Sequence, residues 1–139
     1  MGDPFHLQRF VEAQAPVYAE VCAELRRGRK TSHWIWFIFP QIRGLGSSET
    51  AQYFAIASRA EARAYMEHPV LGARLRECTE LVARVKNKSI DQIFGYPDNL
   101  KFQSSMTLFA RASEDNEVFI EALKKYFDGE SDPQTLARL

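Results

Sequence analysis

The strongest constraint on the fold is a run of apolar residues at helical spacing near the middle of the chain. It follows Pro69, and its members recur at intervals of four, three, four and three residues. They are Leu71, Leu75, Cys78, Val82 and Val85. This spacing places the side chains on one face of an α-helix, while arginines and glutamates occupy the other faces. The segment is therefore predicted to be a helix that packs one narrow face against the core.

The beginning of the chain also contains helix boundaries. The Asp3–Pro4 pair is typical of a helix start, because aspartate accepts hydrogen bonds from free N–H groups and the fixed φ of proline suits the first turn. We expect a first helix to run to about Gln14 and to break before Pro16, which has no N–H to donate. A second helix is expected to end at Gly28.

Three later positions indicate further helix starts. Ser58 with Glu61, and Ser89 with Gln92, match the capping box, in which a serine and a glutamate or glutamine satisfy free N–H groups at the start of a helix. Asp98 is expected to cap the helix that follows it. Helices are thus predicted along most of the chain.

Residues 32–39 have an ambiguous pattern. Their continuous aromatic and β-branched run is compatible with a buried strand or a short buried helix. The chain has no second strand candidate, and a lone strand would leave its backbone groups without partners. A short helix or turn, capped by Thr31 or Ser32 and ended by Pro40, is therefore favoured. The predicted fold is all-α, a single compact domain over residues 1–139 with about six to eight helices, several of them short.

Length and charge limit the classes of function. The chain has 139 residues, of which 45% are hydrophobic, and this is enough for one continuous core. Because 18 Lys and Arg residues balance 18 Asp and Glu residues, no nucleic-acid or membrane partner is expected. No apolar run reaches the roughly 18 residues needed to span a bilayer and no signal peptide is recognisable, which predicts a cytoplasmic location. The oligomeric state stays open.

The cysteines and histidines do not form a recognisable metal motif. Cys22 and Cys78 lie within apolar helical patterns, and neither has the spacing of a metal or redox motif. We expect both to be buried free thiols. The three histidines, His6, His33 and His68, contain no helical metal-binding pair. No metal and no cofactor is therefore expected.

The segment from Gly28 to Ser48 mixes aromatic bulk with polar residues and glycines more than any other part of the chain. It contains both tryptophans and a glycine turn, Gly44 to Gly46, that is followed by two serines. The cations at its start, Arg29 and Lys30, do not require a functional explanation, because positive charge is favoured at the C-terminal end of the preceding helix. Packing does not explain the other polar residues, and we interpret the segment as a ligand-binding loop.

A second polar group follows Asp98. The core face of this helix is predicted to consist of Leu100, Phe102, Met106 and Phe109. Lys101 and Ser105 are four residues apart, and Ser104 and Thr107 are three apart, so each pair shares a helical face. Serine and threonine are poor helix formers. Their hydroxyls are therefore expected either to bond to the preceding turn or to face a specific partner.

Together the two groups suggest a site for a small anionic ligand that is nucleotide-like or phosphate-like. Such a ligand binds well where N–H groups of a glycine turn converge with cations and hydroxyls, and tryptophan can stack on a planar ring. The turn matches neither the P-loop nor the dinucleotide-binding motif. The predicted ligand-binding residues are Lys30, His33, Trp34, Gln41, Arg43, Gly44, Gly46, Ser47, Lys101, Ser104 and Ser105.

The sequence does not decide whether the protein is an enzyme. His33 and Asp98 are the candidates for proton transfer. A histidine that bonds a carbonyl group and an aspartate that caps a helix would explain both residues without catalysis. The chain contains no GxSxG elbow and no Cys–His arrangement.

Four segments of the chain resemble a known family. They are RFVEAQ (9–14), GRKTSHWIWFIFPQIRGLGSS (28–48), YFAIASRAEARAYMEHPVLGARLREC (53–78) and IFGYPDNLKFQSSMTLF (93–109). These segments are similar to a bacterial family of small proteins of unknown function, some of whose members have carried the label calpastatin. The resemblance extends from about Phe5 to Leu136 and implies an all-α single domain with no established activity. Calpain inhibitors of the calpastatin type are largely disordered and poor in aromatic residues, whereas this chain is 12% aromatic.

Two hypotheses about function follow. In the first, the loop 28–48 and the polar face of 98–107 line a pocket for the anionic ligand. The alternative is a protein-interaction or scaffold module without catalysis, which uses the Trp-rich loop as its contact surface. Convergence of the polar residues around one concavity would favour the first hypothesis.

Overall fold

Ten α-helices form the described part of the chain, residues 2–139, in this computed structural model. In chain order they are α1 (Gln8–Gln14), α2 (Tyr18–Arg27), α3 (Ile35–Ile38), α4 (Glu49–Tyr53), α5 (Arg59–Glu67), α6 (Leu71–Arg84), α7 (Ile90–Phe94), α8 (Asp98–Ala112), α9 (Glu117–Phe127) and α10 (Pro133–Ala137). An isolated β-bridge between Ile42 and Ile56 joins two loops. The fold is all-α, as predicted.

The number of helices exceeds the six to eight that were predicted. Six helices are longer, and the other four, α3, α4, α7 and α10, have only four or five residues each. Three of these short helices begin at a side chain that accepts a hydrogen bond from a first-turn N–H group: Ser48, Ser89 and Asp132. Helices this short are marginal alone and depend on caps and tertiary contacts. The sequence pattern therefore undercounts them.

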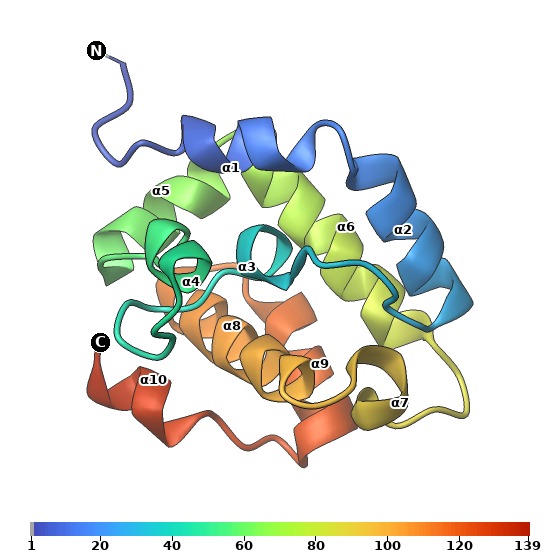
Figure 1. The fold of residues 1–139 in the computed structure, drawn as a ribbon. Coiled ribbons are helices and arrows are strands. Elements are labelled where there is room, and N and C mark those ends of the chain that lie inside the picture. Colours follow the sequence, from blue (N-terminus) through green and yellow to red (C-terminus); the bar gives the residue numbers. More distant parts are fainter. Residues whose placement is uncertain (1) are drawn as a thin grey trace.

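Helix α8 is the centre of the fold. It packs against α3, α5, α7, α9 and α10, and Figure 1 shows it crossing the middle of the molecule, with α1 and α2 along one side and α10 on the opposite side. All of its residues from 104 to 110 are buried, hydroxyl-bearing residues included. Leu100, which was predicted to lie in the core, is instead 46% exposed. The polar face that was expected on this helix is therefore mostly interior.

Helix α6 confirms the pattern that most constrained the fold. Leu71, Leu75, Cys78 and Val82 are all buried, and Val85 packs at the edge of the core as the residue that ends the helix. Cys22 and Cys78 are buried free thiols, as predicted. Among residues 2–139 no helix combines the length and the apolar character that crossing a membrane requires.

The N-terminal boundaries are only partly as predicted. Helix α1 begins at Gln8 and not at Asp3–Pro4. The Asp3 carboxylate still caps it from a distance, because its two oxygens accept hydrogen bonds of 2.7 Å from the N–H groups of Leu7 and Gln8. The expected end of α1 at Gln14 is confirmed. The end of α2 is also confirmed, since Gly28 adopts the left-handed conformation with φ of 72°.

The three predicted caps have different outcomes. The capping box of Ser89 and Gln92 is confirmed. Ser58 caps α5, but Glu61 does not complete that box, because its carboxylate binds the Ala57 N–H and Arg9 instead. The prediction that Asp98 caps α8 is wrong. Asp98 is the first residue of that helix, and its carboxylate pairs with two lysines.

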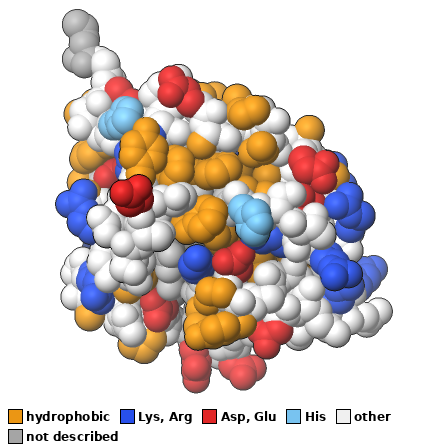
Figure 2. All heavy atoms as spheres, viewed as in Figure 1, with side chains coloured by type: hydrophobic (Ala, Val, Ile, Leu, Met, Phe, Trp, Pro, Cys, Tyr) orange, Lys and Arg blue, Asp and Glu red, His pale blue; other side chains and the backbone are white. Residues whose placement is uncertain are grey.

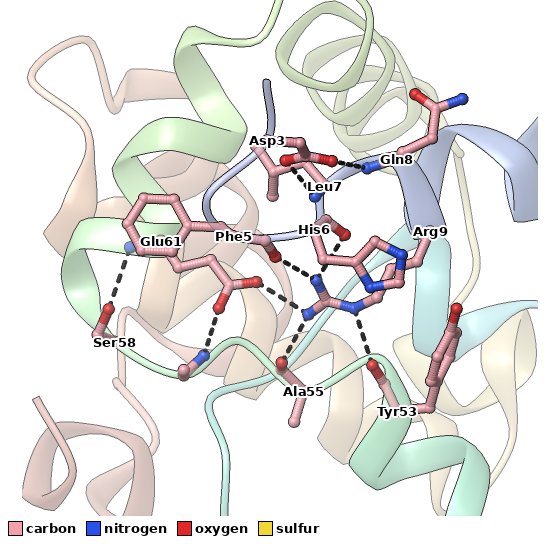
Figure 3. A network of polar contacts seen from close by, with 11 residues as sticks. Asp3, Phe5, His6, Leu7, Gln8, Arg9, Tyr53, Ala55, Ser58 and Glu61 are labelled. Carbon is pink, nitrogen blue, oxygen red and sulfur yellow. Dashed lines mark hydrogen bonds and ion pairs between the residues drawn. The ribbon is translucent and has the colours of Figure 1, made fainter. Parts of the chain in front are cut away.

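A buried network around Arg9 joins the N-terminal segment to the rest of the molecule (Figure 3). The guanidinium donates to four backbone carbonyls, those of Phe5, His6, Tyr53 and Ala55. Its remaining hydrogen bond, of 2.8 Å, goes to the Glu61 carboxylate of α5. The Arg9 and Glu61 side chains are only 7% and 4% exposed. All five N–H groups of the guanidinium thus have partners, which is what a buried charge requires.

Candidate functional site

The loop before α3 is held in place by one buried carboxylate. Glu24 of α2 accepts hydrogen bonds from the backbone N–H groups of Thr31 and Ser32, from the Ser32 hydroxyl and from the indole N–H of Trp34. Burial of the Glu24 carboxyl raises its pKa, but these hydrogen bonds outweigh burial and lower the pKa to about 2. The loop therefore reaches α3 in a fixed conformation.

This arrangement corrects the expected start of the short helix. Helix α3 covers only Ile35–Ile38 and ends before Pro40, as favoured, but neither Thr31 nor Ser32 caps it. Their N–H groups are already bound to Glu24. The interpretation of residues 32–39 as a short helix is otherwise confirmed.

Two lysines share one carboxylate at the start of α8. The Nζ atom of Lys30 lies 2.7 Å from Oδ2 of Asp98, and the Nζ atom of Lys101 lies 3.7 Å from Oδ1. The Lys30 side chain is only 7% exposed and that of Asp98 is 18% exposed. Each ammonium group also lies over an indole ring, Lys30 at 5.2 Å from the centroid of Trp34 and Lys101 at 5.1 Å from that of Trp36. The cluster carries one more positive than negative charge.

A hollow of about 270 Å³ opens beside this cluster. Its lining residues are Gln41, Leu45, Gly46, Pro97, Leu100, Lys101, Gln103, Ser104, Asp132 and Gln134. They come from the loop after α3, from the first half of α8 and from the C-terminal segment. Four of them, Gln41, Gly46, Lys101 and Ser104, were predicted from the sequence as ligand-binding residues. The hollow thus combines residues from both predicted polar groups.

The glycine turn separates this hollow from a second one of about 420 Å³. Arg43, Gly44 and Gly46 line the second hollow together with Gln52 and Ala55. Gly44 has a φ of 102°, and a Cβ atom there would lie 2.7 Å from Nε of Arg138. The turn therefore needs glycine at this position for its backbone conformation, whereas the flexible Arg138 side chain can move away from a Cβ atom.

Several predicted residues lie away from the first hollow. Trp34 is buried in the core at 2% exposure, with its N–H bonded to Glu24. Ser105 is fully buried, and its hydroxyl has no hydrogen-bond partner within residues 2–139. His33 and Ser47 are exposed and do not line the hollow. Lys30 does not line the hollow, and it is linked to Lys101 by the Asp98 carboxylate that the two lysines share.

The hydroxyls of Ser104 and Thr107 bond to the preceding turn, which is the first of the two alternatives left open by the sequence, whereas the Ser105 hydroxyl does not. Ser104 donates to the Leu100 carbonyl and Thr107 donates to the Gln103 carbonyl, each one turn earlier. Both also hold the C-terminal segment. The Ser104 hydroxyl lies 2.9 Å from Oδ2 of Asp132, and the Thr107 hydroxyl accepts from the Asp132 N–H at the same distance.

The C-terminal segment supplies residues that the sequence analysis missed. Asp132 and Gln134 line the hollow, as does Gln103 of α8. Asp132 caps α10, which begins at Pro133. Its position beside Ser104 depends on a contact across 28 residues. No local signal in the sequence reports that contact.

The surface around this region has mixed charge. Figure 2 shows a histidine, basic side chains and an acidic side chain next to one another near the middle of the face, bordered by hydrophobic side chains. Within residues 2–139 no group of three or more His, Cys, Asp or Glu side chains is arranged to hold a metal ion. The polar lining of the hollow consists of amides, a lysine, a serine and an aspartate. These groups are suited to reversible binding of a small polar molecule.

Comparisons with known proteins agree with the fold and give no activity. Residues 4–139 match a family described as "Protein of unknown function (DUF1810)". The chain is also similar to the crystal structure of the conserved hypothetical protein Rv1873 from Mycobacterium tuberculosis, with 58% identity and a TM-score of 0.98. That match covers 99% of this chain and 98% of the other. A comparison with curated proteins gave no match.

Proposed function

The chain belongs to the DUF1810 family of proteins of unknown function, and from its side-chain arrangement we propose that it binds a small anionic ligand, nucleotide-like or phosphate-like. The proposed site is the hollow between α8, the loop 41–46 and the C-terminal segment. The observation that carries this proposal is the convergence of Gln41, Gly46, Lys101 and Ser104 around one concavity.

Lys101 supplies a positive charge in the lining for an anionic ligand. Within residues 2–139 the ion pairs of Lys30 and Lys101 both go to Asp98, so this cluster beside the hollow carries one net positive charge. The Asp132 carboxylate also lines the hollow and its negative charge offsets that of the cluster, but its Oδ2 atom is held by hydrogen bonds from Ser104 and from the N–H and hydroxyl groups of Thr135. Lys101 is therefore the group best placed to attract an anion, and its charge would be weakly screened in a concave site.

The remaining lining suits the uncharged part of such a ligand. Gln41, Gln103 and Gln134 offer amide donors and acceptors, while Leu45 and Leu100 add apolar surface. The volume of about 270 Å³ is near the lower end of small-molecule sites. A phosphate group with one small polar or planar substituent fits these dimensions better than a large cofactor.

Protein binding is the second candidate function, and exposed apolar side chains at the edge of the same hollow favour it. Tyr96 is 81% exposed and Leu100 is 46% exposed, which is unusual for large apolar side chains and is a feature of contact surfaces. Both lie next to Pro97 at the start of α8. Trp34 is buried and Trp36 is half-buried, so the Trp-rich loop offers less contact surface than this group.

Thermal unfolding with a panel of ligands tests the proposed site. The panel contains inorganic phosphate, AMP, ADP-ribose, NAD and ribose 5-phosphate. A ligand present at about ten times its Kd adds roughly 1.4 kcal/mol of stability, which raises Tm by about 3–5 °C in a domain of this size. We expect at least one compound to do so. If no compound in the panel raises Tm, the proposed ligand site is wrong.

Two variants and a matched control locate the binding. Lys101→Met and Gln41→Ala are expected to abolish most of the ligand-induced rise in Tm. Lys86→Met removes the same charge from an exposed position outside the hollow and is expected to keep the full rise. If all three variants respond to ligand as the unmodified protein does, the ligand binds elsewhere and the proposed site is wrong.

A further inference from the structure

An arginine-lined hollow lies between α5 and the end of α8, two helices that pack against each other. Its volume is about 440 Å³, and its lining residues are Arg59, Ala60, Arg63, Arg111, Ala112, Ser113 and Glu114. None of these residues belongs to the hollow of the proposed function. Arg59 and Arg63 are one turn apart on α5, and Arg111 lies in the last turn of α8.

The positive charges of this hollow are poorly balanced. Glu114 is the only acidic residue in the lining, and its side chain is 94% exposed and 3.8 Å from Arg63. Arg63 has a second long contact, of 3.7 Å, with Glu67. Within residues 2–139 Arg59 and Arg111 form no ion pair and no side-chain hydrogen bond. Exposed ion pairs at these distances contribute little to stability and are easily exchanged, so all three guanidinium groups are available to a ligand.

The position of Arg59 is unfavourable for folding. It is the first residue of α5, where the helix macrodipole is positive and acidic residues are preferred. An oxyanion in the hollow would relieve this local cost, because it would balance the charge of Arg59 and of the other two arginines.

We propose that this hollow binds the phosphate monoester group of a small molecule. The planar fork of a guanidinium matches two oxygens of a phosphate, and several arginines together favour a dianion over a monoanion. The volume of about 440 Å³ is larger than a phosphate needs and lies within the range of small-molecule sites, which leaves room for the organic part. Ala60 and Ala112 also line the hollow, and their small side chains leave space for the organic part of the ligand.

Nuclear magnetic resonance titration of the full chain is the test, because it locates the binding. The probes are glucose 6-phosphate, inorganic phosphate and glucose, each added at low salt. Glucose 6-phosphate is expected to shift the backbone amide signals of residues 59–63 and 111–114 in a saturable manner. Inorganic phosphate is expected to shift the same signals with weaker affinity, and glucose to leave them unchanged. Binding is expected to weaken as salt is added.

Variants separate this site from other basic surfaces. Arg59→Gln with Arg111→Gln removes two exposed charges that form no ion pair within residues 2–139, and it is expected to weaken glucose 6-phosphate binding by at least about tenfold. Arg29→Gln removes an exposed arginine elsewhere and is expected to change the affinity by less than about twofold. Lys101→Met is expected to have as little effect, which distinguishes this site from the site of the proposed function.

Three results would overturn the inference. The first is the absence of saturable shifts at residues 59–63 and 111–114 with millimolar glucose 6-phosphate. The second is equal weakening by the Arg29 control and by the double variant, which would indicate a general charge effect. The third is glucose or inorganic phosphate binding as tightly as glucose 6-phosphate, because the hollow would then not recognise a phosphate monoester.

Discussion

Arg9 and Glu61 form a buried ion pair of 2.8 Å that joins the N-terminal helix to α5 across 52 residues of sequence. The pair is embedded in hydrogen bonds, since Arg9 also binds four carbonyls and Glu61 also accepts from the Ala57 N–H. A buried charge is tolerated only when its partners are complete. The arrangement therefore makes the N-terminal segment part of the folded domain.

Replacing Arg9 should be strongly destabilising. Arg9→Met is expected to lower the free energy of unfolding by roughly 3–5 kcal/mol, because it leaves the Glu61 charge buried without its counter-ion and several carbonyls without the donor that Arg9 supplied. Urea unfolding measures this change. Arg84→Met, which removes an exposed arginine 3.5 Å from Glu80, is the control and should cost less than about 0.5 kcal/mol. Similar values for the two variants would show that the Arg9 network is not a main support of the fold.

Glu24 should make stability depend on pH in the acid range. Its pKa is lowered from 4.5 to about 2 in the folded protein, so the carboxylate stabilises the fold fully above about pH 4.5. This contribution, up to about 3 kcal/mol, is lost as the pH falls from about 4.5 to about 2.

Glu24→Gln isolates that contribution. The variant is expected to be less stable than the unmodified protein at pH 7, because an amide cannot accept four hydrogen bonds from N–H and hydroxyl donors as a carboxylate does. The difference in free energy of unfolding should shrink steadily between about pH 4.5 and pH 2. Chemical unfolding at a series of pH values measures it. A difference that does not change with pH would contradict the role given to the Glu24 charge.

Gly72 should not tolerate alanine even though it lies inside a helix. Alanine normally stabilises a helix by about 1 kcal/mol relative to glycine. Here a Cβ atom would lie 2.1 Å from the backbone carbonyl oxygen of Met66, so α5 and α6 would have to separate. We expect Gly72→Ala to lower stability by about 1–3 kcal/mol or more. Thermal unfolding tests this.

The neighbouring position supplies the comparison. Ala73→Gly, at an exposed position of the same helix, should cost about 1 kcal/mol and reports the ordinary helix propensity. If Gly72→Ala instead raises the stability by a similar amount, the contact with Met66 relaxes without cost and the prediction is wrong.

Asp98 should oppose the binding of an anion while stabilising the fold. Asp98→Asn removes the charge shared by Lys30 and Lys101, and we expect it to lower the free energy of unfolding by about 1–3 kcal/mol. The same change should strengthen the binding of an anionic ligand in the hollow, because Lys101 loses its counter-ion. Calorimetric titration at low salt measures the affinity. Asp115→Asn, which removes an exposed carboxylate outside the lining of this hollow, is the control.

The opposite result is equally informative. If Asp98→Asn weakens the binding of a ligand that Lys101→Met strengthens, the hollow selects a cation and the proposed function is wrong. Higher salt should reduce the effect of Asp98→Asn on affinity more than its effect on stability, because Asp98 and Lys30 are largely buried.

The sequence by itself determined most of the helices, because helix formation depends largely on residues three and four apart. The spacing from Leu71 to Val82 predicted α6, and Gly28 predicted the end of α2. The box of Ser89 and Gln92 likewise predicted the start of α7. Each signal involves neighbours within one or two turns, which the sequence brings together without help from the rest of the chain.

Only the tertiary structure decided which polar groups meet. Asp98 was expected to cap α8 but pairs with Lys30, and Glu61 was expected to complete a capping box but pairs with Arg9. Ser105 shares a helical face with Lys101, yet it is fully buried and does not line the hollow. A buried polar side chain bonds to whichever polar groups the packing places within its reach, and that packing depends on helices that are distant in the sequence. The residues that could bind a ligand were therefore partly visible in the sequence, whereas the hollow they form with the C-terminal segment was not.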